Sequence, residues 1–562
     1  MITIVRDEEK TPFKSSSNPN LLNVSPKVSM RRLSRSNTLP RMPRLEVEGG
    51  ATLDDLSTLS MEPSKVTRLR RWIISLVVVD FDIDYGPKVT GIYPPLQFSA
   101  QEESNIAFSS FPDSPQAESG SYIHSFRIRC PASVAQAAMD EITPGAEVDG
   151  FIYGFAHFTQ RRDPKSKRGY QQRSLVILSQ HAYPSLFYSM SSYLGEEFLS
   201  HGGPMLEVAC HNVANWPDPH PSTTLELGFL GYVFTTDLPE ASGAQLANAL
   251  NKVQAKPDPY MHIIATLAPQ QPPIIDALQS CLAHLWSIWE CLILCEPILV
   301  FGTSAAMASQ VVWWLRGLLH PIPLAGDFRP FFTIHDSDHS TLVNCRAPQA
   351  GLLLGVTNPF FNRACSHWPH VLSVGPSKKK ATQGSANISG GPPLGWTTKT
   401  HKRHVSKDLV LLRKLQDALH RDERAQLEAS EALREHLTSR TTAFLVPLQR
   451  YLNTLIPTHA DPAPTPFPPA RLKPFNENAF FASLKANGSP LPFKRSAKRK
   501  DFYEKWMRTR AFGLWLAGQE EVVNRVLSEP PSSALLPRTA RLEPSRPQSA
   551  RPVSPSGSVS SG

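Results

Sequence analysis

One group of residues whose types could carry out proton chemistry lies in the ten-residue stretch DFRPFFTIHD, residues 327–336. It contains Asp327, Arg329, His335 and Asp336. An imidazole beside a carboxylate is the pattern of an oriented general base. A general base also needs a group to activate, and no plausible nucleophile stands close by in the sequence. The stretch therefore favours recognition of a partner through charge and aromatic contact over bond-making chemistry.

Other signatures of catalysis or ligand binding are missing from the sequence. Neither G-x-x-x-x-G-K-[ST] nor G-x-G-x-x-G occurs, so the chain is not expected to bind a nucleotide itself. The motifs G-x-S-x-G and H-E-x-x-H are absent as well. Cys291 and Cys295 have no second pair at ligand spacing, and Pro369 keeps His367 and His370 off one helix face. We therefore expect no metal ion and no cofactor.

The basic excess of the chain sits in segments that lack hydrophobic periodicity. Lys plus Arg exceed Asp plus Glu by 58 − 49 = 9 in the 562 residues. Residues 1–68, 373–405 and 528–562 are predicted to be a disordered basic arm, a basic flexible linker and a disordered tail. A nucleic-acid-binding domain would gather cations and stacking aromatics on a folded face. We therefore expect no nucleic-acid partner and a weak affinity for an anionic membrane surface.

The basic arm carries two candidate phosphorylation sites. Ser34 and Thr38 each follow an arginine by three residues, which suits basophilic kinases. The stretch RSNTLP around Thr38 resembles the docking motif of phosphopeptide-binding adaptors. A solvated basic tail is the alternative interpretation, because short motifs recur by chance.

Cysteine usage and hydropathy indicate a reducing compartment. The seven cysteines are an odd number, lie in apolar runs and form no C-x-x-C pair, so free buried thiols are expected. The N-terminal stretch MITIVRDEEK has no apolar core of a signal peptide. The longest apolar runs are too short to span a bilayer. We expect a soluble, cytoplasmic protein whose membrane contact is peripheral.

Hydrophobic patterns divide the chain into three folded segments. Residues 69–215 begin with a buried strand at 72–79, a turn at 84–87 and a returning strand at 88–93. Further strands are predicted at 122–129, 150–159 and 173–179, with helices at 102–110 and 183–200.

The two later segments have different patterns. Residues 216–372 alternate helix and strand, as α/β layering requires. They include predicted helices at 274–285 and 304–319, with Thr303 or Ser304 as the cap of the second, and a strand at 292–300 that is broken by Glu296 and Pro297. Residues 406–527 show leucine and aromatic stripes of helices, with Ser406 as a cap and one final helix at 498–526. The predicted fold class is α/β plus α.

Long blocks of the sequence resemble DENN-domain proteins of class six. The blocks are IISLVVVDFDIDYGPKVTGIYPP with SNIAFSSFPDS, WECLILCEPILVFGTSAAMASQVVWWLRGLL with PLAGDFRPFFTIHDSD, and GLLLGVTNPFFNRACSHWPHVLSVG. The helical end, LVPLQRYLNTLIP with FYEKWMRTRAFGLWL, is similar to the same subfamily. The resemblance covers residues 70–527 and implies a tripartite architecture. Its parts are an upstream longin-like α/β module, a central α/β module and a downstream all-helical module.

The resemblance also implies a function. DENN proteins are guanine-nucleotide exchange factors for Rab GTPases, and the class-six branch is linked to endosomal recycling and cell-adhesion traffic. Such a factor binds the nucleotide-free GTPase more tightly than the loaded one, so it weakens nucleotide binding by the same factor and needs no acid, base or metal. One alternative is a scaffold that binds a Rab or an adaptor without stimulating exchange. Another is a GTPase-activating protein that supplies Arg329 as an arginine finger.

We expect the GTPase-binding surface to be shared between the first two segments. The candidate residues are Asp82, Asp84, Tyr85 and Pro87 at the hairpin, and Asp327, Arg329, Phe331, His335 and Asp336 in DFRPFFTIHD. The alternative places Phe331 and Phe332 in the core and makes Asp327 and Arg329 a structural ion pair.

Overall fold

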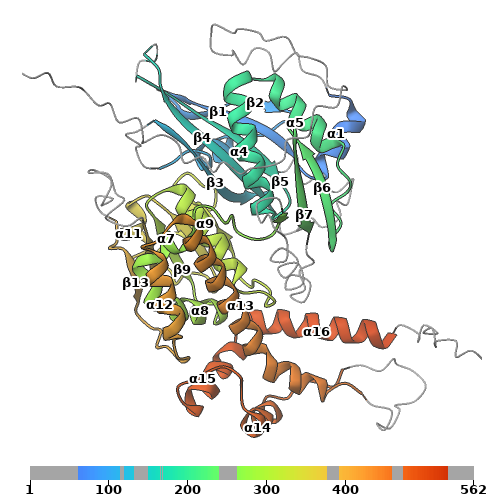
Figure 1. Ribbon diagram of the computed structural model, residues 1–562, viewed down its shortest axis with the longest axis vertical. Helices are drawn as coiled ribbons and strands as arrows, with labels where there is room; N and C mark the ends of the chain where they lie inside the picture. The colour runs from blue at the N-terminus through green and yellow to red at the C-terminus, as the bar shows by residue number, and fades with distance from the viewer. Residues whose placement is uncertain are drawn as a thin grey trace, which may run out of the picture.

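The computed structural model describes residues 61–113, 119–131, 150–164, 169–238, 262–375, 391–457 and 472–528, with Val134 and Ser166. Within these ranges the fold is mixed α/β, with two five-stranded sheets, one three-stranded sheet and a helical C-terminal part. Figure 1 shows the first sheet at the top, the second in the middle and the last helices at the bottom. No helix in these ranges is long and apolar enough to cross a membrane. The predicted phosphorylation sites Ser34 and Thr38 lie outside the described residues.

The first sheet is antiparallel and has the strand order β2-β1-β5-β4-β3. Its strands are β1 (Ser75–Asp82), β2 (Gly86–Tyr93), β3 (Gly120–Arg129), β4 (Phe151–Arg162) and β5 (Tyr170–Ser179). The β1–β2 hairpin turns between Asp82 and Gly86, and Gly86 takes a φ of +81° that residues with a side chain rarely adopt. The predicted hairpin is confirmed, although β1 begins three residues later than expected.

Helices cover the first sheet. Helix α4 (Pro184–His201) packs on β4 and β5, α5 (Pro204–Ala214) packs on α4, and α2 (Ala100–Ser109) packs on β2. A capping box starts α2, because the Ser99 hydroxyl accepts from the Glu102 amide and the Glu102 carboxylate accepts from the Ser99 amide at 2.7 Å. Helix α1 (Pro63–Arg70) packs on α5, so the end of the predicted disordered arm is helical instead.

A three-stranded sheet that the sequence patterns do not predict follows these helices. It consists of β6 (Thr223–Phe229), β7 (Tyr232–Leu238) and β8 (His262–Ile264), in that order. Strand β6 packs on α5 and β8 packs on α4, and Figure 1 shows β6 and β7 beside α5. The boundary expected after residue 215 therefore separates this sheet from the helices that cover it.

The second sheet has the order β10-β11-β9-β12-β13, parallel except for β13. Its strands are β9 (Ile298–Gly302), β10 (Phe328–Arg329), β11 (Leu353–Val356), β12 (His370–Val374) and β13 (Gly395–Thr398). The helices around it are α7 (Ile274–Leu278), the 3-10 helix η2 (Gln279–His284), α8 (Leu285–Ile293), α9 (Ala305–Gly317), α10 (His339–Leu342) and α11 (Phe360–Ala364). Ser304 caps α9, as expected, by accepting from the Met307 amide at 3.2 Å.

Two sequence expectations fail around this sheet. The strand predicted at 292–300 begins only at Ile298, because residues 292 and 293 complete α8. Most of that run is buried, with residues 295–297 only partly so, and periodicity cannot distinguish a buried helix from a buried strand. Within the predicted linker 373–405, β13 pairs with β12 and Val405 is fully buried, so residues 391–405 belong to the folded unit. Residues 376–390 lie outside the described ranges.

The C-terminal part of the described chain is helical. It comprises α12 (Leu409–Ala418), α13 (Glu423–Asn453), α14 (Glu477–Asn487), α15 (Ser496–Met507) and α16 (Arg510–Ser528). Asp408, rather than the expected Ser406, caps α12 by accepting from the amides of Val410 and Leu411, each at 3.0 Å. The single helix predicted at 498–526 is two helices, and the Thr509 hydroxyl accepts from the Phe512 amide where the second begins.

Buried apolar side chains connect all these parts. One continuous cluster runs from Leu69 of α1 through Trp289 of α8 to Trp506 of α15. The Trp289 indole donates to the Thr441 hydroxyl of α13 at 2.9 Å. A second cluster joins the first sheet to Phe331. The three predicted segments therefore share a core, and each depends on its neighbours for burial.

The cysteines mostly match the expectation. All seven are free, and Cys210, Cys281, Cys291 and Cys365 are buried. Cys345 is exposed, because it lies in the loop after α10 and outside the apolar core. The expectation of buried thiols is therefore wrong for that residue.

Candidate functional site

Arg329 is the centre of a buried charge network. Its side chain is fully buried, and its Nε lies 2.9 Å from Asp327 Oδ2. Its Nη1 lies 3.7 Å from Asp336 Oδ2, and its Nη2 forms an ion pair with Asp338. A buried guanidinium is stable only when carboxylates and hydrogen bonds replace its water, and this site provides both.

The same network attaches the first sheet to the second. Arg127 of β3 pairs with Asp327, and Arg129 of β3 lies 2.8 Å from Asp338 Oδ2. Arg329 also donates to the backbone carbonyl of Arg127 at 3.2 Å. We call Arg127, Arg129, Asp327, Arg329, Asp336 and Asp338 the arginine network. Its members tie β3 to the segment that carries DFRPFFTIHD.

This geometry corrects part of the predicted binding surface. Arg329 and Asp336 are buried among charges of the same chain, and Asp327 is mostly buried beside them. Phe331 is buried in the core of the first sheet, edge-on to His124 at 5.2 Å between ring centroids. These side chains hold the two sheets together and do not face a partner. An arginine finger must reach out of its own protein, which Arg329 does not do.

The hairpin residues are placed differently. Ile83 and Tyr85 at the tip are 51% and 78% exposed, and Asp84 is exposed between them. Asp82 shapes the turn, since its Oδ1 accepts from the amides of Asp84 at 2.8 Å and Tyr85 at 3.1 Å. These backbone hydrogen bonds hold the pKa of Asp82 below its ordinary value. The turn thus presents two exposed apolar side chains on a rigid support.

A cleft of about 770 Å³ opens beside the hairpin. It brings Pro87 of the hairpin and His335 of DFRPFFTIHD to the same hollow. The His335 ring stacks on Phe108 of α2, with 3.8 Å between ring centroids. The residues that line the cleft come from β1, β2, α2, β4, β5 and nearby loops. They include Asp80, Ile83, Pro87, Phe108, Asp113, Gln160, Tyr170, Arg173 and His335.

Polar groups form the floor of this cleft. Asp80 and Arg173 pair across β1 and β5 at 2.6 Å. Burial raises the pKa of Asp113 to about 7, and its Oδ2 has no hydrogen-bond partner in the described part of the chain. Sequence reasoning did not single out Phe108, Asp113 or Arg173. The first two stand in the quoted block SNIAFSSFPDS, so the family resemblance was the signal that could have found them.

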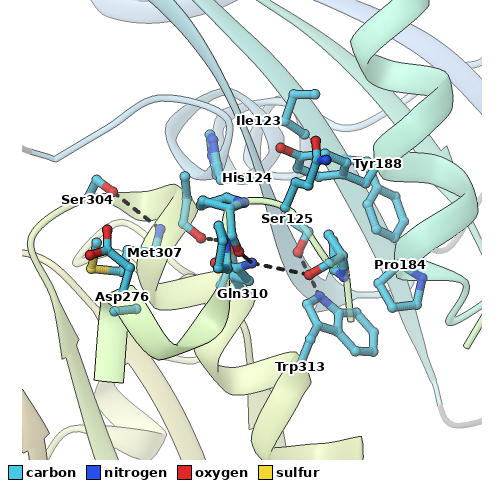
Figure 2. Close-up of a pocket in the computed structure, with 18 residues that line it drawn as sticks. Ile123, His124, Ser125, Pro184, Tyr188, Asp276, Ser304, Met307, Gln310 and Trp313 are labelled. Atoms are coloured by element: carbon cyan, nitrogen blue, oxygen red, sulfur yellow. Dashed lines mark hydrogen bonds between the residues drawn. The ribbon is translucent and has the colours of Figure 1, made fainter. Parts of the chain in front are cut away.

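A second, smaller cavity of about 110 Å³ lies where α9 meets β3. Figure 2 shows Gln310 and Trp313 reaching from α9 toward the facing segments. Trp313 donates to the Ser125 hydroxyl at 2.7 Å, and Gln310 donates to the carbonyls of Pro269 and Pro272. Burial lowers the pKa of the adjacent His124 to about 4. The cavity is a narrow gap in a well-bonded junction between the two sheets.

A histidine–carboxylate group lies at the junction of α8 with the C-terminal helices. The Glu290 carboxylate is fully buried and accepts from His401 Nε2 at 2.9 Å, His404 Nδ1 at 3.1 Å and the Val405 amide at 2.6 Å. His404 Nε2 lies 2.9 Å from Asp501 Oδ2 of α15. We call Glu290, His401, His404 and Asp501 the histidine network.

Donor atoms of this network lie close enough to hold a metal ion. Those of Glu290, His401 and His404 lie within 4.8 Å of one another, as do those of Cys291, Glu296 and His401. In the first group the hydrogen bonds described above already use the Glu290 oxygens. The absence of a bound metal stays a prediction.

Comparison with known proteins identifies the family. No family model matches the chain. It is 29% identical over 468 residues to human protein DENND6B, covering 80% of this chain and 79% of that protein. It is 27% identical over 475 residues to mouse protein DENND6A, covering 81% and 78%. The DENND6 homolog of Dictyostelium discoideum is 27% identical over 544 residues, covering 83% and 73%. The chain is a DENND6-type DENN-domain protein.

The cleft of this DENND6-type chain is built from two of the sequence blocks that carried the resemblance. The hairpin, Phe108 and Asp113 belong to the first block, and His335 belongs to the second. The two blocks meet where His335 stacks on Phe108, although these residues lie more than 200 positions apart in the sequence. The tripartite arrangement of the family stays an expectation, because the sheets and helices described here share one core.

Proposed function

We propose that this chain promotes GDP release from a Rab-type GTPase by binding it at the cleft beside the β1–β2 hairpin. The observation that carries the proposal is the pairing of an exposed apolar tip, Ile83 and Tyr85, with a polar cleft of about 770 Å³. Exposed aromatic and aliphatic side chains beside buried charges are the composition of an interface hot spot. Membership of the DENN family, which the resemblance links to Rab exchange, supports the same function.

The mechanism requires no covalent step. A GTPase holds its nucleotide with its own phosphate-binding loop, Mg²⁺ and switch segments. A partner that binds the empty GTPase more tightly than the loaded one must weaken nucleotide binding by the same factor. The tip of the hairpin would displace a switch segment, while the cleft holds the polar groups that this displacement frees. Both elements rest on strands of one sheet, so they would keep their geometry during exchange.

The competing functions differ in what they require of this surface. A scaffold would use the same cleft to bind a Rab or an adaptor without releasing its nucleotide. A GTPase-activating role through Arg329 is not supported, because that guanidinium is fully buried and paired with carboxylates of its own chain. We further propose that the protein acts on the cytoplasmic side of endosomal or vesicle membranes, and that an adaptor reads phosphorylated Ser34 or Thr38.

The test is release of a fluorescent GDP analogue from a panel of purified Rab proteins. The full chain should accelerate release from at least one of them. The double variant Ile83→Ala, Tyr85→Ala should lose at least about tenfold of this rate, since a hot-spot side chain contributes on the order of 2 kcal/mol. Its melting temperature should not change, because both side chains are exposed. The matched control is Leu514→Ala, Val522→Ala, which truncates two exposed apolar residues of α16.

The outcomes separate the candidate functions. Stable binding of an empty Rab without faster release supports the scaffold. Faster hydrolysis of GTP supports an activator. Equal release rates for the hairpin variant and the α16 control would mean that the hairpin does not contact the GTPase and that another surface binds it.

A further inference from the structure

A cluster of cations forms where two distant segments meet beside α12. Residues 402–407 and 492–495 are joined by a bridge between Val405 and Phe493. The Ser406 amide donates to the Pro492 carbonyl at 2.9 Å, and the Lys494 amide donates to the His404 carbonyl at 3.0 Å. This pairing places Lys494 beside the segment that carries Arg403 and Lys407. Neither segment alone has this density of charge.

These three cations lack carboxylate partners in the described ranges. Burial lowers the pKa of Lys407, and the charges of Arg403 and Lys494 lower it further. Arg403 Nε is buried without a hydrogen-bond partner. Elsewhere on the same part of the molecule cations are paired, as Lys505 is with Asp501 at 3.0 Å. Unpaired cations repel one another, and an anion bound from outside would relieve that repulsion.

The outer face of α12 adds apolar contact to this charge. Leu409 and Val410 in its first turn are 58% and 65% exposed. Arg413 and Lys414, four residues further on, stand one turn away on the same face and are also exposed. Asp408, the neighbouring acid, is occupied with the amides of Val410 and Leu411. Exposed aliphatic side chains flanked by cations are the composition of helices that lie at a lipid surface.

We propose that Arg403, Lys407 and Lys494, together with Leu409, Val410, Arg413 and Lys414 on the outer face of α12, form a docking surface for an anionic phospholipid membrane. Phospholipid headgroups supply the negative charge that these cations lack, and the acyl boundary accepts the two aliphatic side chains. Nucleic acid is the competing anion, and it would call for exposed aromatic side chains on which bases stack. The exposed large apolar residues here are leucine and valine instead.

This surface extends the earlier expectation that basic tails and the linker provide membrane affinity. It places folded residues, rather than flexible ones, at the lipid contact, and so fixes how the molecule would stand on a membrane. Figure 1 shows β1 and β2 at the top of the molecule, away from α12 and α15. A membrane held at α12 would therefore leave the hairpin open to a GTPase on the same membrane. The inference does not require that exchange occurs.

The charge component is tested by co-sedimentation of the full chain with vesicles of phosphatidylcholine alone or with phosphatidylserine added. The double variant Lys407→Glu, Lys494→Glu should bind the phosphatidylserine vesicles at least tenfold more weakly, since each cation at the surface contributes about five-fold. The control Lys65→Glu, Arg68→Glu makes the same change of net charge on α1, away from the patch. It should keep most of the binding. The difference in vesicle binding between the two variants should become smaller as the salt concentration is raised.

The apolar component has its own variant, Leu409→Ser, Val410→Ser. It should weaken vesicle binding at high salt, where the charge contribution is screened, and should leave the melting temperature unchanged. Equal vesicle binding by the charge-reversal variant and its α1 control overturns the proposal. Loss of binding to a labelled oligonucleotide, with vesicle binding kept, also overturns it and makes the patch a nucleic-acid contact. Exchange assayed without vesicles reports on the hairpin alone, so the two proposals fail independently.

Discussion

Two buried charge networks hold this molecule together, and they use different cations. The arginine network joins the first sheet to the second through Arg127, Arg129 and Arg329. The histidine network joins α8 to the C-terminal helices through His401 and His404. Arginine presents a planar fork of five N–H donors that can bind carboxylates in pairs, whereas a histidine ring presents one nitrogen on each of two edges. The first junction therefore relies on a guanidinium shared among several carboxylates, and the second on a carboxylate shared between two imidazole rings.

The hydrogen-bond geometry sharpens this difference. His404 has Nδ1 at 3.1 Å from Glu290 Oε2 and Nε2 at 2.9 Å from Asp501 Oδ2. The ring therefore links the Glu290 carboxylate of α8 to the Asp501 carboxylate of α15. In the arginine network the Arg329 guanidinium instead contacts three carboxylates of its own segment and donates to the Arg127 carbonyl of β3. The surface that includes the proposed GTPase cleft is therefore supported by guanidinium–carboxylate pairs, whereas the C-terminal helices are attached through imidazole rings.

Replacing Arg329 should have the largest effect. Arg329→Met would leave Asp327, Asp336 and Asp338 without the guanidinium that they share, and breaking a buried ion network costs about 3–5 kcal/mol. We expect the free energy of unfolding, measured in denaturant, to fall by that amount. GDP release should decline in parallel, as protein unfolds.

The exposed pair Arg424–Glu428 provides the control for this measurement. Its side chains are 85% and 68% exposed, so Arg424→Met should change the free energy of unfolding by less than about 1 kcal/mol. If Arg329→Met abolished exchange and left the unfolding curve in place, Arg329 would contact the partner directly. The structural role assigned above would then be wrong.

Sequence patterns predict which helices and strands this fold contains better than they predict the residues at which each begins and ends. The β1–β2 hairpin and the cap of α9 follow from turn and capping residues, which act within a few positions of the chain. The end of α8 and the start of β9 lie in one mostly apolar run, and because α8 and β9 are each buried throughout, neither shows a periodic signal. Strand β13 is short and lies in a Gly- and Lys-rich stretch, so pairing with β12, rather than local preference, makes it a strand.

The residues of the candidate site likewise fall into those whose exposure follows from local sequence and those whose burial follows from distant contacts. Tyr85 and Ile83 are exposed because a tight turn leaves its tip in solvent, which the sequence alone predicts for the turn. The burial of Arg329 depends on Arg127 and Arg129, about 200 residues earlier, and no local pattern reports such a meeting. DFRPFFTIHD has the composition of an interface hot spot, but most of its side chains contact other residues of the same chain and are buried. His335 is the member that reaches the cleft.

Replacing Glu290 should have the second largest effect and should act on the other junction. Glu290→Gln removes a carboxylate that accepts from His401, His404 and Val405, and we expect a loss of about 2–3 kcal/mol in the free energy of unfolding. Burial alone would raise the pKa of Glu290, but these hydrogen bonds outweigh it and hold the pKa below its ordinary value. Its contribution is therefore present above the ordinary pKa of 4.5 and is lost as pH falls through the lowered value.

The gap between wild type and the Gln variant should accordingly narrow below pH 4.5 and stay constant above it. Glu428→Gln, on an exposed residue, is the matched control and should shift the unfolding curve by less than about 0.5 kcal/mol. A gap that did not change with pH would mean that Glu290 contributes through shape and not through its charge.

The smallest expected effect has the opposite sign and returns to the arginine network. Burial raises the pKa of Asp336 to about 6, although Arg329 opposes the shift. A raised carboxyl pKa means that stability is present below the ordinary value of 3.8 and is lost as pH rises through about 6. At 1.36 kcal/mol per pKa unit the ionised form costs up to about 3 kcal/mol at pH 7.

Asp336→Asn avoids that cost and keeps the oxygen that accepts from the Asp338 amide at 2.8 Å, but its buried amide group lacks a partner and costs about 2 kcal/mol. We therefore expect the Asn variant to be about 1 kcal/mol more stable than wild type at pH 7 and less stable at pH 4. Unfolding in denaturant at the two pH values measures this, with Asp417→Asn on an exposed residue as the control. A variant less stable than wild type by the same amount at both pH values would show that Asp336 is a full ionic member of the arginine network, and that the network balances three cations with three anions.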